Sequence, residues 1–371
     1  MLKIITVIGA RPQFIKAATL SRVFAKYPDQ IKELIVHTGQ HFDQNMSEIF
    51  FKEMEIPIPH YNLNINGLSH GAMTGQMLEG IEKIIVAEKP DYLLVYGDTN
   101  STIAGALAAK KLHVKVIHVE AGLRSYNMNM PEEINRILTD RISDVLFCPT
   151  QAAIDNLKKE GFDYIKTQIV LSGDVMQDAA LYYKQKSDQI SSVLASNKIK
   201  NNEFVLATIH RAENTDDEIR LKEIVHSLNE INKTIKVIVP LHPRTGKILK
   251  DKNMEVEFSI IKPVGYFDML QLISHSRLVL TDSGGLQKEA YFFNKYCITF
   301  RDETEWVELV ENGYNQIVGA SSEKIIAAFK DSINKNFTKA EELYGGGKVA
   351  ETICGVILRL DNNFLSIQVR D

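Results

Sequence analysis

The sequence predicts an α/β protein with two doubly wound domains, and three observations support this fold class. Short apolar runs alternate with helical patterns, and continuous Val, Ile and Leu runs are typical of parallel strands covered on both faces. The pattern pauses in a polar stretch at 184–202 and then restarts; this stretch is the best candidate for a linker, with an earlier hinge near Gly173 as the alternative. The 371 residues also suit two domains, since a domain holds on the order of 150 residues. We therefore expect domains at 1–172 and 173–354, with a C-terminal helix at about 355–371 returning to the first.

Each predicted domain has its own series of strands. In the first domain the expected strands are Lys3–Ile8, Glu33–Thr38, Tyr92–Tyr96, Lys115–Val119, Val145–Cys148 and Gln168–Leu171. In the second they are Phe204–Ile209, Lys236–Leu241, Ser259–Ile261, Leu278–Thr281 and Cys297–Phe300. Ligands of open α/β sheets bind beyond the carboxyl ends of the strands. Polar and glycine-rich residues at those ends are therefore the candidate site residues.

Composition and charge exclude several classes of function. A net charge of −4 provides no basic field for nucleic acid. Cys148, Cys297 and Cys354 are far apart and odd in number, which argues against a disulfide framework and a thiolate metal site. The chain shows no signal-peptide pattern and no run of about 18 apolar residues. We therefore expect a cytoplasmic protein that neither spans a membrane nor binds nucleic acid.

Charged residues follow three strands of the first half. Arg11 and Lys16 place two cations after the first strand, where the alternative is a capped turn with solvated charges. Asp98 and Glu120 each follow a buried strand. Asp98 could instead cap the next helix. Glu120 could instead pair with Arg124, because a carboxylate at the end of a buried strand needs a partner or a function.

A helix start supplies two further candidates. The segment 130–136 reads MPEEINR, and proline with acids in the first turn is ordinary helix-start chemistry. Glu132 or Glu133 could therefore serve only that purpose. Arg136 lies four residues after Glu132, one turn along the same face of the helix.

The second half offers histidines and a glycine-rich turn. His210 and His242 each end a strand beside an arginine, which suits phosphate contact or acid–base chemistry, although a lone histidine is more often structural. In the segment 281–290, two glycines after a serine open a helix whose amides can bind a diphosphate. The acid in its second turn is placed to accept ribose hydroxyls. The alternative is an ordinary turn between strand and helix. These candidates are Ser283, Gly284, Gly285 and Glu289.

Several cofactor and catalytic motifs are missing from the sequence. There is no GxGxxG after the first strand, no P-loop, no HExxH and no GxSxG. We therefore expect no nicotinamide or other cofactor and no metal.

Eight motifs occur in an order that resembles one family. They are GARPQFIK at 9–16, VYGDTNST at 95–102, HVEAGLRS at 118–125, PEEINRILTD at 131–140, IHRAEN at 209–214, LHPR at 241–244, TDSGGLQKEA at 281–290 and YGGGKVAE at 344–351. Over nearly the whole chain they resemble the non-hydrolysing UDP-N-acetylglucosamine 2-epimerases. The resemblance implies a GT-B architecture, two Rossmann-like domains with a nucleotide-sugar cleft between them. It also implies a homodimer that acts on a UDP-linked 2-acetamido sugar.

The resemblance also implies roles for the candidate residues. Ser283, Gly284 and Gly285, helped by Arg11, would hold the diphosphate, and Glu289 would bind the ribose. Asp98, Glu120 and Glu132 would be the acid–base carboxylates, with Arg136 and His210 near the sugar and phosphate. Lys16, His242 and Arg301 are further candidates for substrate contact.

The chain departs from the family at two places. Members that act on UDP-N-acetylglucosamine usually read TERPE where this chain reads TEWVE, so Trp306 replaces an arginine. In this it resembles the branch that acts on UDP-2,3-diacetamido-2,3-dideoxyglucuronic acid. Gln40, His41 and Gln44 match the surroundings of the family's regulatory site, but the arginine expected near 69–70 is absent.

The chemistry narrows the reaction. C2 of a 2-acetamido sugar has no adjacent carbonyl, so its proton is not acidic. Expelling UDP from C1 as C2 loses its proton, and then adding UDP back, requires carboxylates near C2 and a site for the departing diphosphate. The sequence offers both. The resemblance further implies a role in making bacterial surface polysaccharide precursors. The rivals are a GT-B glycosyltransferase, a hydrolysing epimerase and a nucleotide-sugar-binding protein without activity.

Overall fold

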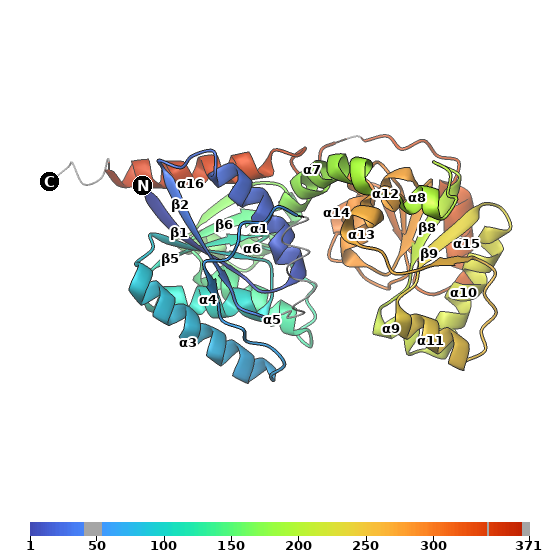
Figure 1. The fold of residues 1–371 in the computed structure, drawn as a ribbon, viewed down its shortest axis with the longest axis horizontal. Coiled ribbons are helices and arrows are strands. Elements are labelled where there is room, and N and C mark those ends of the chain that lie inside the picture. The colour runs from blue at the N-terminus through green and yellow to red at the C-terminus, as the bar shows by residue number, and fades with distance from the viewer. Residues whose placement is uncertain (41–53, 340, 366–371) are drawn as a thin grey trace. The chain divides into compact units, whose positions relative to one another are not determined.

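The structure, a computed structural model, describes residues 1–40, 54–339 and 341–365 (Figure 1). The chain forms two compact units, Met1–Ala179 with Glu342–Asp371, and Ala180–Glu341. Each unit contains one parallel sheet among its described residues, with helices around it. The predicted α/β fold class is confirmed in each unit.

The first unit has a sheet with the strand order β3-β2-β1-β4-β5-β6-β7. The order reverses between β1 and β4, and ligands of such sheets bind at this switch point. The strands are β1 (Leu2–Ile8), β2 (Ile31–His37), β3 (Tyr61–Asn62), β4 (Tyr92–Tyr96), β5 (Lys115–Val119), β6 (Val145–Cys148) and β7 (Gln168–Leu171). The helices are α1 (Arg11–Phe24), α3 (His70–Glu88), α4 (Asn100–Lys111), α5 (Pro131–Ile142), α6 (Gln151–Lys159), the 3-10 helix η1 (Phe162–Tyr164) and α16 (Val349–Leu365).

The second unit repeats this plan with the strand order β10-β9-β8-β11-β12-β13, which reverses between β8 and β11. Its strands are β8 (Phe204–Thr208), β9 (Lys236–Pro240), β10 (Ser259–Ile261), β11 (Leu278–Thr281), β12 (Cys297–Thr299) and β13 (Asn315–Ile317). Its helices are α8 (Val193–Ser196), α9 (Ala212–Thr215), α10 (Glu218–Asn232), α11 (Pro243–Asp251), α12 (Tyr266–His275), α13 (Gly284–Phe292), α14 (Val307–Glu311) and α15 (Ser322–Ser332). The helix α7 (Val175–Ile190) contains the boundary between the units.

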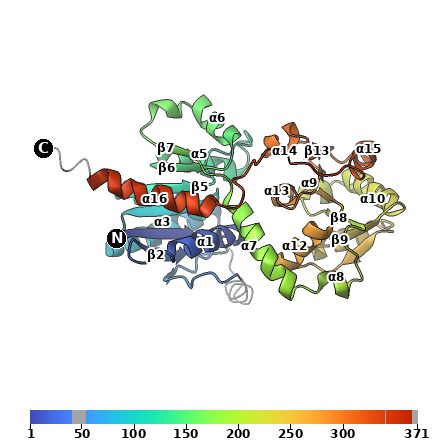
Figure 2. The same cartoon turned by 90° about the horizontal axis from the view of Figure 1, so that it is seen from above.

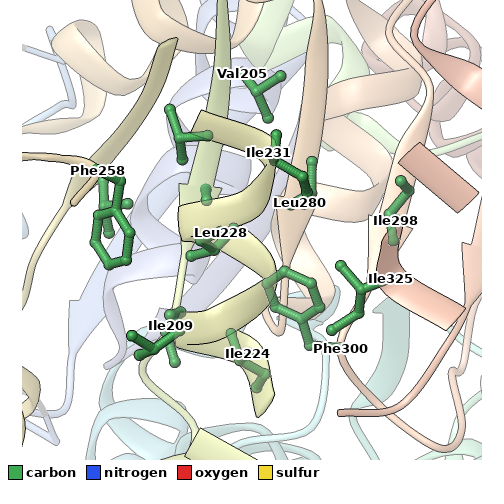
Figure 3. Packing of buried hydrophobic residues seen from close by; sticks show 14 of the residues in the cluster. Val205, Ile209, Ile224, Leu228, Ile231, Phe258, Leu280, Ile298, Phe300 and Ile325 are labelled. Atoms are coloured by element: carbon green, nitrogen blue, oxygen red, sulfur yellow. The ribbon is translucent and has the colours of Figure 1, made fainter. Parts of the chain in front are cut away.

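Apolar strands carry the core of the second unit. Figure 3 shows Val205 of β8 and Leu280 of β11 in one cluster with side chains of the helices, among them Leu228 of α10 and Ile325 of α15. All four side chains are fully buried. Burial on this scale makes the two central strands a rigid base for the loops at their carboxyl ends.

Two strands were not expected from the sequence. The first, β3, is only two residues long, and the second, β13, reads Asn-Gln-Ile and lacks an apolar run. Both lie at the edge of a sheet, where pairing with one neighbour needs no strong hydrophobic pattern.

The unit boundaries differ from the predicted domain limits of 172 and 354. Residues 173–179 and 342–354 belong to the first unit. Hydrogen bonds join these two segments: Asp174 N donates to Tyr344 O at 2.9 Å, and Gly346 N donates to Gln177 Oε1 at 2.7 Å. Beyond them, α16 packs beside α1 (Figure 2).

The predicted polar linker at 184–202 is wrong, because this stretch is mostly helical. It comprises the end of α7 and the whole of α8. Ser187 Oγ donates to Phe267 O at 2.6 Å, and the rings of Tyr183 and Phe267 meet edge to face. Polar residues of this stretch, among them Ser187, therefore pack on α12.

Within residues 1–40, 54–339 and 341–365, no helix has both the length and the apolar character needed to cross a membrane.

Asp178 of α7 joins the start of α16 in the first unit. Its Oδ2 accepts a hydrogen bond from Ala350 N at 2.8 Å, and its side chain is buried. Burial raises the pKa of Asp178 to about 6, and the amide bond from Ala350 opposes this rise only in part. The ionised form is therefore disfavoured in the fold.

We expect Asp178→Asn to change the pH dependence of unfolding. A carboxyl group with a raised folded pKa adds stability below its unfolded pKa of about 4. That contribution is lost as the pH rises through about 6. The free energy of unfolding of the unmodified protein should fall, relative to Asp178→Asn, by about 1 kcal/mol between pH 5 and pH 7. Urea unfolding measures this, with the exposed Asp163→Asn as control. Equal pH dependence in the unmodified protein and Asp178→Asn would contradict the assignment.

Candidate active site

In the first unit, the candidate residues gather where β1, β4 and β5 end. Lys16 lies in the second turn of α1, where it is buried, and its ammonium group pairs with the carboxylate of Glu120. Arg11 is the first residue of the same helix and is exposed. The first turn of α1 is anchored by Gln13, whose Oε1 accepts from Gly9 N and Ala10 N at 2.8 and 2.9 Å.

Glu120 is held in an unusual backbone conformation. Its φ of 72° lies in the left-handed region, which costs an L-residue roughly 1 kcal/mol or more. The amides of Glu120 and Ala121 both donate to Phe147 O, at 3.1 and 3.0 Å, and hold the turn. The alternative pairing with Arg124 is excluded, because that guanidinium binds Asp140 and Glu160 instead. A strained backbone that aims an acid into a switch point is typical of functional sites.

Asp98 follows β4 and does not cap the next helix. Thr99 is the cap of α4, since its Oγ1 accepts from Thr102 N at 3.3 Å and Thr102 Oγ1 accepts from Thr99 N at 3.2 Å. The capping alternative for Asp98 is therefore excluded. Its carboxylate pairs with the guanidinium of Arg136 instead.

Gly97 lets these groups approach one another. Its φ is 61°, and an added Cβ would lie 3.1 Å from Glu120 Oε2 and 3.5 Å from Lys16 Nζ. A side chain here would press on the Glu120 carboxylate, which would have to move by a few tenths of an ångström. The positive φ is the stronger reason for glycine at this position.

Glu132 and Glu133, neighbouring acids at the start of α5, have different surroundings. Glu133 is buried, pairs with Arg136, and accepts from Tyr126 N at 2.9 Å and Ser125 N at 3.0 Å. These bonds hold the loop before the helix. Glu132 is exposed in the same turn. The open choice between the two acids is therefore narrowed: Glu133 has a structural role and Glu132 remains the candidate for catalysis.

Asp98 and Glu133, the two acids that contact Arg136, have pKa values shifted in opposite directions. Burial raises the pKa of Asp98; the Arg136 charge opposes this rise and the Glu120 charge adds to it. Burial also raises the pKa of Glu133, but backbone amides and Arg136 outweigh it, so the net shift is downward. A raised pKa brings Asp98 closer to the range that suits proton transfer at neutral pH.

In the second unit, His210 lies after β8 and pairs with a buried acid. Its Nδ1 is 2.9 Å from Asp282 Oδ1, and the other oxygen of Asp282 accepts from His210 N and Arg211 N at 2.9 and 3.0 Å. Sequence reasoning did not single out Asp282. It ends the buried strand β11, and the same reasoning that selected Glu120 would have found it. The pair fixes the ring and leaves Nε2 available for a phosphate or a proton.

The start of α13 and the segment after β12 lie together. Ser283 caps α13, where its Oγ accepts from Leu286 N at 3.5 Å. A Cβ on Gly284 would lie 2.8 Å from Glu305 Oε1, so the Glu305 carboxylate would have to move to make room for a side chain. Arg301 is buried and its Nη1 is 2.9 Å from Glu305 Oε2. The start of α13 thus lies beside an ion pair, and its first-turn amides are of the kind that can bind an anion.

Three further residues singled out from the sequence lie elsewhere in the second unit. His242 is exposed and caps α11, where its Nδ1 accepts from Arg244 N at 3.3 Å. Glu289 is buried in the second turn of α13, with 8% of its surface exposed. Trp306 is buried, and the Lys288 ammonium lies 3.8 Å from the centroid of its ring. Contact of any of them with a ligand remains a prediction.

The predicted regulatory surroundings are described only in part. Gln40 Oε1 accepts from Ser101 Oγ at 2.8 Å and Ser101 N at 3.1 Å. His41 and Gln44 lie outside the described residues.

Comparison with known proteins decides the family. A family model described as UDP-N-acetylglucosamine 2-epimerase matches residues 25–358. The chain belongs to the UDP-N-acetylglucosamine 2-epimerase family. This confirms the resemblance found in the sequence, and with it the assignment of the chain as an isomerase, a UDP-sugar 2-epimerase.

Individual relatives cover nearly the whole chain. It is 54% identical over 360 residues to UDP-2,3-diacetamido-2,3-dideoxy-D-glucuronate 2-epimerase of Pseudomonas aeruginosa, an alignment covering 97% of this chain and 100% of the relative. The crystal structure of Methanocaldococcus jannaschii UDP-GlcNAc 2-epimerase in complex with UDP-GlcNAc and UDP has a TM-score of 0.82 at 44% identity, covering 96% of this chain and 99% of that one. The enzyme from Neisseria meningitidis bound to UDP-GlcNAc has a TM-score of 0.84 at 31% identity, covering 96% and 100%. These relatives support the GT-B assignment.

Proposed function

We propose that this enzyme is a non-hydrolysing epimerase that inverts C2 of UDP-2,3-diacetamido-2,3-dideoxyglucuronic acid. The observation that carries the proposal is the 54% identity to the Pseudomonas aeruginosa enzyme named for that sugar. Trp306, in place of the arginine usual in the UDP-N-acetylglucosamine branch, agrees with it. The runner-up substrate is plain UDP-N-acetylglucosamine, for which other relatives are named.

The reaction consists of an elimination and its reversal on the other face. A base takes the proton from C2, and the electron pair of the broken C2–H bond forms the C1=C2 double bond. The bond between C1 and oxygen breaks at the same time, and UDP leaves with its electrons. UDP then adds back to C1 of the glycal while an acid delivers a proton to the opposite face of C2. Atoms and charge balance without a redox partner.

The acids of the first unit are proposed to carry the proton transfers. Asp98 and Glu120 lie at the switch point of the sheet, paired with Arg136 and Lys16 respectively. Glu132 is exposed to solvent in the first turn of α5. The cations keep two carboxylates close together at one sheet edge, where like charges alone would raise both pKa values. A raised pKa of Asp98, caused first by burial, suits a group that must bind and release a proton.

The second unit is proposed to bind UDP and stabilise it as a leaving group. Backbone amides at Gly284 and Gly285 donate to the diphosphate, and Ser283 shapes the helix start. His210 adds a hydrogen-bonding ring nitrogen and Arg301 adds positive charge, with Arg11 as a further contact. Glu289 accepts the ribose hydroxyls. Positioned acids account for about 10²–10⁴-fold in rate, so leaving-group stabilisation must supply much of the remainder.

A homodimer and a cytoplasmic location are parts of the same proposal, as is a role in supplying bacterial surface polysaccharide precursors. The resemblance implies the dimer, and size-exclusion chromatography with light scattering measures it.

Replacing each acid tests its role. We expect Asp98→Asn, Glu120→Gln and Glu132→Gln each to lower kcat by at least about 10²-fold, because each removes a proton donor or acceptor. The Kd for UDP, measured by calorimetry, should stay near that of the unmodified enzyme. Glu133→Gln is a matched structural control, because it alters the neighbouring acid that holds the loop; it should lower stability more than any of the three. Normal turnover in any of the three acid variants would assign that residue to structure alone.

The choice of sugar tests the substrate. Incubated with one UDP-sugar and nothing else, the enzyme should equilibrate the C2 epimers, with a higher kcat/KM for the diacetamido-uronate than for UDP-N-acetylglucosamine. Free sugar with UDP would indicate a hydrolysing epimerase, and binding without reaction would favour a glycosyltransferase or a binding protein. A preference of about 100-fold for UDP-N-acetylglucosamine, roughly 2.7 kcal/mol in transition-state binding, would overturn the substrate assignment and leave the reaction class intact.

A further inference from the structure

The first residue of the motif at 118–125 is a buried histidine that the proposed mechanism does not use. The side chain of His118, in β5, has no solvent exposure. Its Nε2 is 2.7 Å from Gly97 O, and its Nδ1 is 2.7 Å from Asp140 Oδ1. The ring therefore lies between the turn after β4 and the helix α5.

The partners determine where the ring protons are. A carbonyl oxygen only accepts, so Nε2 donates to Gly97 O. Burial raises the pKa of Asp140, but the bond from His118 and the charge of Arg124 more than offset it, and the net shift is downward. The carboxylate is therefore ionised and accepts hydrogen bonds. Each ring nitrogen of His118 thus faces an acceptor oxygen at 2.7 Å, and the two contacts fix the orientation of the ring.

Asp140 also contacts the loop that follows β5. Its other oxygen, Oδ2, accepts from Gly122 N at 3.1 Å and from Arg124 Nη1 at 2.7 Å. Gly122 and Arg124 belong to the loop that starts with Glu120. The His118–Asp140 pair thus touches the turn of Asp98, the loop of Glu120 and the helix that carries Glu132.

We propose that His118 and Asp140 are positioning residues that set the relative geometry of the three acids. Neither is proposed to touch the substrate. The inference rests on the proposed acid–base roles of Asp98 and Glu120. Loss of the ring would release Gly97 O, and the turn would then be free to shift Asp98 relative to Glu120. Misplacement of reacting groups by even about 1 Å can cost on the order of 10²-fold in rate.

His118→Phe tests the pair directly, since it keeps a ring and removes both donors. We expect kcat to fall by about 10²-fold, with little change in KM or in the Kd for UDP. Ile85→Ala is the matched structural control. Ile85 is a buried core residue near the end of α3. It should lower the melting temperature and leave kcat near normal. A similar outcome for His118→Phe, lower stability with normal kcat, would overturn the proposal.

Two conservative variants of His118 test its bonds to Asp140 and to Gly97 O one at a time. The shorter amide of His118→Asn can reach Asp140, and the longer amide of His118→Gln can reach Gly97 O. Each should recover part of the kcat lost in His118→Phe. If neither recovers any, although both fold and bind UDP, the ring does not act through these two bonds. These variants also keep the test open should His118→Phe fail to fold.

A double mutant separates this inference from the proposed function. In the Asp98→Asn background, His118→Phe should lower kcat by much less than it does alone, because the acid being positioned is already absent. A full additional loss would contradict positioning. Normal turnover in Asp98→Asn and Glu120→Gln would instead show that the proposed acids are wrong. Normal turnover in His118→Phe, with slow acid variants, would show that the inference alone is wrong.

Discussion

The buried carboxylate of Asp140 organises the carboxyl edge of the first sheet. It lies in the interior with His118 and Arg124, and each of the three has a fully buried side chain. Removing one member of a buried ionic group typically costs about 3–5 kcal/mol. The charges therefore constrain one another, and the loops that carry them have little freedom. Because the loops hold acids whose chemistry depends on sub-ångström placement, this constraint links stability to the proposed catalysis.

Charge pairing continues from this buried group to the site itself. Lys16 balances Glu120, and Arg136 balances Asp98 and Glu133. Without the two cations, the carboxylates would repel one another and take up protons. In the second unit, Asp282 plays a comparable part by orienting His210. The acids proposed to act on substrate in the first unit and the histidine of the second unit are thus each held by a charged partner.

Residues at strand ends were predictable from the sequence, and their partners were not. The pattern of apolar runs located β4 and β5, so Asp98 and Glu120 could be placed at the carboxyl ends of strands, whereas the strand order that puts them near the switch point came from the fold. The sequence left open whether Asp98 caps the next helix. In the structure Thr99 is the cap, through a capping box with Thr102. Whether Glu120 pairs with Arg124 depended on Asp140, twenty residues away in sequence and adjacent only in the fold. The polar segment at 184–202 was misassigned because an amphipathic helix with small polar residues resembles a linker until its packing on α12 is known.

The central claim is that the acids of the first unit exchange the C2 proton with solvent during elimination and re-addition of UDP. The most direct measurement is to run the reaction in deuterium oxide with no added nicotinamide or metal, and to follow C2 by NMR spectroscopy. The account predicts that deuterium appears at C2 as the epimers equilibrate. Complete retention of the original hydrogen at C2 while the epimers equilibrate would contradict it.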